Sequence, residues 1–597
     1  MTSTGSQAIL SGMLIDLPRS ILWCASAALV SLLATACGPN QPSGAAAGSG
    51  DAAFSELAQA VLADRYARHP SEATYLGIHR FDDQLDDFSM AAARSESEAL
   101  GKFRVRLAAI DPATLTANNT LDREQLIHAL DATVLELDTI RMREKDPDAY
   151  SSGITNAAYV IMERKYAPAA TRLKSLIARE QRMPSALEEA RKNLTQAVPI
   201  YTEIAIEQID GNVSFFTNDV PAAFADVTDA TLLAEFRRAN AAVIAALGEY
   251  KTFLEKEVSP RATGSFAFGE DTFRRYLAAS EMVDLPIDRL LEIAEADRQK
   301  NEAAFQATAR QIDPKRSAGE VLASVQRDHP PSAQLLKATQ QTLDSIRQFI
   351  VDHRIMTIPP SDPAEVIETP PFMRSTTSAS MDTPGPFETA QLRAFYNMTL
   401  PDPRTSPAEQ ADFMRRWYYA AISSTSVHEV YPGHFVQFLY APEFPSDVRK
   451  VFSANTNVEG WAHYCEQMML DEGFHAGEPA YRLAQLQDAL LRDVRFIVGI
   501  RMHTRGMTVD EATRLFESQG HEPHSLAVSE AKRGTSDALY GYYTLGKLMI
   551  LKLRDDYKAK MGAAYTLQGF HDAFMKLGPL PLPLIRRAML GGEGSPL

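Results

Sequence analysis

The chain reads Ser426-Val427-His428-Glu429-Val430-Tyr431-Pro432-Gly433-His434 at the point where two imidazoles and a carboxylate stand closest together. A zinc-hydrolase helix usually reads His-Glu-x-x-His, so that the histidines lie one turn apart and both reach one ion. Here the second histidine comes two residues later. On a straight α-helix, six residues correspond to about 9 Å of rise and roughly 240° of rotation, which would keep His428 and His434 from sharing an ion.

The two additional residues include the means to break the helix. Pro432 lacks the N–H that would bond to the carbonyl of His428, and its ring clashes with that carbonyl, so the helix should kink, bulge or stop there. Gly433 adds backbone freedom. We therefore predict a break at Pro432-Gly433, and a metal site follows if this break turns His434 back toward His428.

A second helix, over residues 458–469, carries the third candidate ligand. Its apolar face has helical periodicity and consists of Trp461, Tyr464, Cys465, Met468 and Met469. The other face carries Glu459, His463 and Glu466. A helix that packs one face into a core can direct a carboxylate of the other face at the first motif.

His428, His434 and Glu459 are the predicted ligands of a Zn²⁺ ion. A catalytic zinc needs three protein ligands and an open position for water, whose pKa it lowers from about 15.7 to about 7. Glu429 then remains free to take the proton of that water. Alternatives stay open at this point, because Ser426-x-x-Glu429 is also a capping box. The histidines could be structural, Glu459 could be a solvated carboxylate, and His463 is a rival ligand.

Composition and periodicity predict the fold class. The 597 residues are 45% hydrophobic and 23% charged, which is typical of a globular protein with two or more subdomains. The net charge of −16 argues against a nucleic-acid partner. Helices are predicted over most of the chain, most clearly over 55–68, 95–110, 121–144 and 232–258, and a further long helix is predicted from near Asp284 to Ile312. Between 359 and 403 this periodicity is lost, and 365–369 and 391–400 are the predicted strands.

We thus predict a mainly α-helical, two-lobed protein with a small β element beside a metal-site cleft. The predicted regions are 54–262, which is helical and has no catalytic cluster, and 263–597, which holds the metal site.

The first fifty residues predict export. Arg19 precedes an apolar run over 21–36 that ends in small residues before Cys37. This run resembles a bacterial lipoprotein signal over residues 1–37, in which Cys37 would be lipidated; a plain signal peptide or an uncleaved anchor is the alternative. Residues 38–53, rich in Gly, Ala, Pro and Ser, predict a flexible tether. Cys465 is then the last free cysteine, so no internal disulfide is expected.

Three motifs resemble those of a bacterial family catalogued as domain of unknown function 885. They are His428-Glu429-x-x-Pro432-Gly433-His434, Glu459-Gly460-Trp461-Ala462-x-Tyr464-x-Glu466 and Tyr543-Thr544-Leu545-Gly546-Lys547-Leu548. Weaker similarity at 70–89 and 570–580 extends the resemblance over nearly all of the mature chain. That family is regarded as zinc metallopeptidases related to the gluzincins, the thermolysin-like class whose third ligand is a glutamate on a downstream helix.

The resemblance implies His428, His434 and Glu459 as zinc ligands and Glu429 as general base. It also implies that His503 or Tyr543 steadies the oxyanion of the reaction, although both residues fit a core role equally well. The chain departs from the family pattern at Phe435, at 499–501 and at 540–542, all of which concern the substrate end of the site. Glu466 is a candidate partner for one of the ligands.

Together these observations predict an envelope-anchored zinc metallohydrolase that faces the periplasm and cleaves short peptides. By resemblance, residues 396–399 would pair with the substrate peptide by strand addition. Two alternatives remain: a non-catalytic metal-binding lipoprotein of the envelope, and a zinc hydrolase of non-peptide amides or esters.

Overall fold

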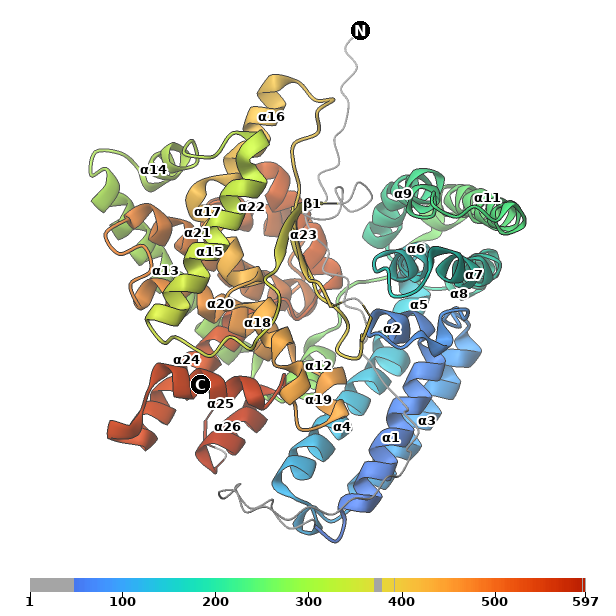
Figure 1. The fold of residues 1–597 in the computed structure, drawn as a ribbon, viewed down its shortest axis with the longest axis horizontal. Coiled ribbons are helices and arrows are strands. Elements are labelled where there is room, and N and C mark those ends of the chain that lie inside the picture. The colour runs from blue at the N-terminus through green and yellow to red at the C-terminus, as the bar shows by residue number, and fades with distance from the viewer. Residues whose placement is uncertain (1–47, 370–377, 391, 593, 596) are drawn as a thin grey trace, which may run out of the picture.

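The computed structural model describes residues 48–597 except 370–377, 391, 593 and 596, and these residues form a mainly α-helical protein with one small sheet (Figure 1). The prediction of a mainly α-helical fold with a small β element is therefore confirmed. The predicted signal peptide and Cys37 lie outside the described residues. The predicted tether over 38–53 is wrong at its end, since helix α1 begins at Asp51, whose carboxylate accepts hydrogen bonds from Thr116 N and Asn119 Nδ2.

The N-terminal helices, blue to green in Figure 1, lie on one side of the molecule. They are α1 (Asp51–Arg68), α2 (Pro70–Tyr75), α3 (Met90–Ala109), α4 (Ala117–Leu135), α5 (Met142–Lys145), α6 (Asp148–Met162), α7 (Ala169–Glu180), α8 (Met183–Asn193), α9 (Pro199–Ser214), α10 (Val220–Ala223) and α11 (Ala230–Phe253). Helices α4, α9 and α11 each run on into a π-helical turn, at Glu136–Ile140, Phe215–Asp219 and Leu254–Val258. The α-helices of the predicted segments 121–144 and 232–258 therefore end earlier than predicted.

The C-terminal helices form the larger body. They are α12 (Glu270–Glu281), α13 (Ile287–Ile312), α14 (Ala318–Val325), α15 (Leu335–Asp352), α16 (Pro407–Met414), α17 (Tyr419–Glu429), α18 (His434–Leu439), α19 (Asp447–Val451), α20 (Asn455–Asp471), α21 (Pro479–Thr504), α22 (Val509–Gln519), α23 (His524–Ser536), α24 (Tyr542–Met561), α25 (Leu567–Lys576) and α26 (Leu582–Leu590). The helix predicted from near Asp284 to Ile312 is confirmed as α13, which begins at Ile287 and ends at Ile312.

The sheet has three strands, β1 (Glu365–Glu368), β2 (Ala379–Asp382) and β3 (Phe395–Met398), in the order β1-β3-β2. β1 pairs with β3 in parallel and β2 pairs with β3 antiparallel, so Tyr396 lies opposite both Val366 and Met381. The two predicted strands are confirmed, and β2 was not predicted. The prediction that a substrate peptide pairs with residues 396–399 by strand addition is wrong. β3 is the central strand, so both of its backbone edges are already paired.

Three large hydrophobic cores hold these elements. One lies entirely within residues 150–258. A second joins α1, α3 and α4 with Val448, Val451 and Phe452 at α19, and the third fills the C-terminal body. At α19 the fully buried Arg449 donates from Nε to Asp122 Oδ1 of α4, at 2.5 Å, and from Nη1 to the carbonyl of Leu577. The packing around α19 thus attaches the N-terminal helices to the C-terminal body, which contains His428, His434 and Glu459.

None of the helices in the described part of the chain is both long and apolar enough to cross a bilayer.

Candidate metal centre

The helix break at Pro432-Gly433 is confirmed. Helix α17 ends at Glu429, the Tyr431–Pro432 peptide bond is cis, and α18 begins at His434. Gly433 N donates to the carbonyl of Val427 at 3.1 Å, which folds the turn against the end of α17. A Cβ atom on Gly433 would lie 1.7 Å from the carbonyl oxygen of His428. Only glycine fits at this close approach.

Trp461 holds the same turn from helix α20. Its indole Nε1 donates to the carbonyl of Pro432 at 2.9 Å, and the side chain is fully buried. This bond ties the turn before His434 to the helix that carries Glu459. The sequence indicated Trp461 only as a core residue, because no local pattern shows what an indole N–H will bond.

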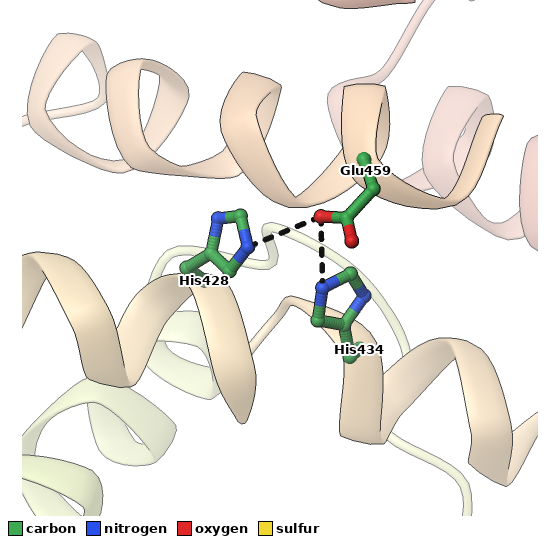
Figure 2. Close-up of side chains that lie close together, drawn as sticks. All are labelled: His428, His434 and Glu459. Atoms are coloured by element: carbon green, nitrogen blue, oxygen red, sulfur yellow. Dashed lines mark ion pairs between the residues drawn. The ribbon is translucent and has the colours of Figure 1, made fainter. Parts of the chain in front are cut away.

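The break brings the three predicted ligands together (Figure 2). His428 Nε2 and His434 Nε2 lie 3.4 and 3.3 Å from the same atom, Glu459 Oε2. The two imidazole rings are perpendicular, with centroids 4.9 Å apart. One potential ligand atom from each residue lies within 4.8 Å of the other two, and no other such group of three or more occurs among the described residues.

The donor set fits a zinc ion. Glu459 Oε2 is buried and has no hydrogen-bond partner, and its ion-pair contacts are those to the two imidazoles. A buried carboxylate oxygen without a partner calls for an explanation, and a cation shared with two imidazole nitrogens supplies one. Two histidines and a glutamate are a ligand set of catalytic zinc.

Glu466 orients the first of these ligands. Its Oε1 accepts a hydrogen bond from His428 Nδ1 at 2.7 Å, so Nδ1 carries the proton and Nε2 keeps its lone pair for a metal. Arg492 Nη2 lies 3.0 Å from the same oxygen, and His463 Nδ1 lies 3.1 Å from Oε2. Burial would raise the pKa of Glu466, but Arg492 and the imidazoles hold it well below its usual range. His463 thus contacts Glu466 and is not a member of the ligand group.

Two contacts fix the helix that carries Glu459. At its start, Glu281 of α12 accepts hydrogen bonds from Asn455 N and Thr456 N, at 3.0 and 2.9 Å. Ala454, the residue before the helix, has no side chain able to do this. Further on, Gly460 meets Gly546 of α24 so closely that a Cβ on Gly460 would lie 2.5 Å from Gly546 Cα. The sequence did not reveal either contact, since both partners come from distant helices.

Glu429 is the last residue of α17 and directly follows His428. Ser426 lies inside the same helix, so the capping-box alternative is excluded. The Glu429 side chain is half-buried and faces β3: after burial, its negative charge is the next cause that raises the pKa of Tyr396. Glu429 therefore adjoins the candidate ligand His428 in the chain, and its carboxylate interacts with Tyr396 of the central strand.

The structure brings Tyr543 to the site. The Tyr543 ring lies 6.3 Å from the His428 ring, and the guanidinium carbons of Arg492 and Arg495 lie 5.5 and 5.2 Å from its centroid. Burial, and then the negative charge of Glu459, raise the pKa of Tyr543 to about 12. Its hydroxyl is therefore a hydrogen-bond donor at neutral pH.

His503 is not brought to the site, which corrects the prediction that it faces the oxyanion. It lies eleven residues after Arg492 in α21, about 16 Å further along the helix axis. Its Nε2 lies 2.9 Å from the carbonyl oxygen of Gly534, and its ring packs edge-on against Phe266 and Phe268. Burial lowers its pKa to about 4, so the ring is neutral. His503 is a core residue in this fold.

Fold and site together define a mainly helical protein with a candidate His-His-Glu metal centre built across a broken helix. Residues 70–589 match the family described as "Bacterial protein of unknown function (DUF885)". This match covers most of the chain, which therefore belongs to that family, as its motifs predicted.

Two solved structures share the fold. A "putative lipoprotein of unknown function" from Shewanella oneidensis is 25% identical, with a TM-score of 0.77 over 90% of this chain and 99% of its own. A "putative lipoprotein" from Colwellia psychrerythraea is 16% identical, with a TM-score of 0.78 over 91% of this chain and 99% of its own. No curated protein matches the chain.

Proposed function

We propose that this protein is a zinc metallohydrolase that cleaves peptide bonds, with His428, His434 and Glu459 as the metal ligands and Glu429 as general base. The observation that carries the proposal is the convergence of three ligand atoms on one point, with Glu459 Oε2 buried and without a hydrogen-bond partner. A bound zinc would supply Lewis acidity and a water of lowered pKa.

The chain's own residues would divide the remaining work. The Glu429 carboxylate accepts a proton from the attacking water and passes it to the nitrogen of the scissile bond, so that the amine leaves neutral as the C–N bond breaks. The Tyr543 hydroxyl donates to the oxygen that becomes negative. The guanidinium groups of Arg492 and Arg495 keep the Tyr543 ring beside His428.

Burial of the site favours short peptides as substrates. Only 8% of the His428 side chain, 9% of Glu459 and 18% of His434 is exposed. A slim extended chain can reach such a site, whereas the surface of a folded protein cannot. The non-peptide amides and esters that use the same chemistry are the second substrate class to test.

Attachment to the cell envelope is part of the proposal. It rests on the apolar run over 21–36 before Cys37 and on the two fold relatives, which are described as putative lipoproteins. Labelling with a palmitate analogue tests it: the wild type should incorporate the label and Cys37→Ser should not. Equal labelling of both proteins would contradict the lipid anchor at Cys37.

The activity test compares three zinc-loaded proteins on a mixed peptide library and on a panel of amides and esters. We expect cleavage by the wild type, a loss of at least about 100-fold in Glu429→Gln, and wild-type rates in Glu235→Gln, a matched change at an exposed glutamate of α11. A wild type that holds zinc and cleaves no peptide would refute the peptidase. If it also leaves amides and esters intact, the non-catalytic metal protein is the better description.

A further inference from the structure

The Glu466 carboxylate, which orients His428, is itself held by donors on both oxygens. Oε1 accepts a hydrogen bond from His428 Nδ1 at 2.7 Å and forms an ion pair with Arg492 Nη2 at 3.0 Å. Oε2 receives His463 Nδ1 at 3.1 Å. The side chains of Glu466 and His463 have no exposed surface, so water cannot replace a missing donor.

His463 is fixed in one protonation state by its surroundings. A carboxylate oxygen only accepts, so the proton of His463 must lie on Nδ1. The opposite nitrogen, Nε2, is buried and has no hydrogen-bond partner. Burial first, and then the positive charge of Lys547, lower the pKa of His463 to about 3, although Glu466 opposes this. The ring is therefore neutral at pH 7 and can donate through Nδ1 alone.

The positive charge near His463 is that of Lys547, which is held by a hydrogen-bond network of three helices. Lys547 of α24 is fully buried, and its Nζ donates to Asp297 Oδ2 of α13 at 2.7 Å. Asn301 Nδ2 lies 3.2 Å from that oxygen and 2.7 Å from Asp493 Oδ2 of α21. Thr544 Oγ1 donates to Asp493 Oδ1 at 2.8 Å. The network thus holds the Lys547 charge close to His463, where α20 packs against α24.

We propose that His463 is a positioning residue for the metal centre: its Nδ1–H holds Glu466 in the one orientation that presents His428 Nε2 to the ion. Without this donor, Glu466 Oε2 is a buried acceptor left unpaired, and the carboxylate gains freedom to rotate away from His428. Loss of such a partner behind a ligand typically weakens metal affinity about 10- to 100-fold. The proposal rests on the metal centre of the proposed function and not on peptide cleavage.

Two amide substitutions separate the position of the donor from the bulk of the side chain. In His463→Asn the amide nitrogen can occupy the place of Nδ1, whereas in His463→Gln the longer side chain carries it to the place of Nε2. The measurement is the Kd of zinc at pH 7, by competition with a chromogenic chelator, with thermal unfolding of each metal-free variant as the check on folding.

We expect His463→Asn to bind zinc within about threefold of the wild type and His463→Gln to bind it about 10- to 100-fold more weakly. The ¹⁵N shifts of His428 should show the Nδ1–H form in the wild type and in the Asn variant. Equal zinc affinity of the Gln variant and the wild type would overturn the proposal, as would an equal loss in both variants or a wild type without zinc affinity. A wild type that binds zinc without cleaving peptides would refute the peptidase alone.

Discussion

Glu180 of α7 and Glu466 of α20 are both shielded from solvent, yet at neutral pH Glu180 is protonated and Glu466 is ionised. Neither oxygen of Glu180 has a hydrogen-bond partner, and burial alone raises its pKa to about 9. Glu466 is equally buried, but an arginine and two imidazoles keep its pKa well below the usual range. Burial neutralises a carboxyl unless neighbouring helices deliver donors and positive charge to it. The helices of the C-terminal body supply such donors and charge to Glu466, whereas the N-terminal helices supply none to Glu180.

Three glycines inside N-terminal helices also differ from three glycines at the metal site. A methyl group on Gly101, Gly211 or Gly248 of the N-terminal helices would meet nothing within 4 Å. At Gly433, Gly460 and Gly546 of the C-terminal body it would strike backbone atoms. Close backbone contacts therefore position the metal-site helices.

The largest effect is expected from Gly433→Ala. The added methyl would lie 1.7 Å from the carbonyl oxygen of His428, so the turn must move and take His434 with it. We expect a loss of roughly 3 kcal/mol or more in the free energy of unfolding, together with loss of zinc binding. Calorimetry and metal analysis check this result. An alanine variant with wild-type zinc content would show that the turn does not set the site.

Glu180→Gln tests the isolated carboxyl. The pKa of Glu180 in the folded protein is about 9, above the usual value of 4.5. The folded state is therefore fully stable below pH 4.5, where Glu180 is protonated in both states, and it loses stability as the pH rises toward 9. At pH 7 the need to keep Glu180 protonated lowers the free energy of unfolding by about 3 kcal/mol. Glutamine does not titrate, so the variant should gain stability over the wild type at pH 8 and little at pH 4.5. Parallel pH profiles of unfolding for the two proteins would contradict the assignment.

Trp461→Phe removes one hydrogen bond and keeps an aromatic ring in place. The carbonyl of Pro432 loses its donor, so we expect a loss of about 1–2 kcal/mol in stability and weaker zinc binding. The matched control is Trp417→Phe, because the buried Nε1 of Trp417 has no hydrogen-bond partner. Equal zinc affinity of the two variants would mean that the bond to Pro432 does not position the turn.

The smallest effect is expected from Gly248→Ala in the exposed interior of α11. The methyl meets no atom there, and alanine favours the helix by about 0.5–1 kcal/mol. Thermal unfolding should shift slightly upward, with zinc affinity unchanged. A destabilised variant would indicate that the N-terminal helices are packed as closely as the metal-site helices.

Local chemistry made much of this structure predictable. Pro432 cannot continue a helix, and a break there is what allows His428 and His434 to meet, so the helix break could be predicted from the local sequence. The periodicity of residues 458–469 placed Glu459 opposite a buried face. Helix α13 was predicted to its last residue, because its apolar positions keep a helical period.

What could not be predicted depends on contacts between distant segments. The Glu281 cap on α20 and the Gly460–Gly546 contact each join two helices. Strand β2 is four residues long and has no alternating pattern that would separate it from a loop. His503 matched a family position, but its distance from Arg492 along α21 carries it away from the ligands. The family resemblance identified His503 as a candidate site residue, but only the folded structure shows that it lies away from the ligands.

The most direct test of the account is the position of the ion itself. Crystals grown with zinc should show, in anomalous difference maps at the zinc edge, one strong peak within bonding distance of His428 Nε2, His434 Nε2 and the Glu459 carboxylate. Crystals of His434→Ala should lack that peak. A peak bound by His463, a peak elsewhere in the protein, or a site that stays at full strength in His434→Ala would contradict the metal centre described above.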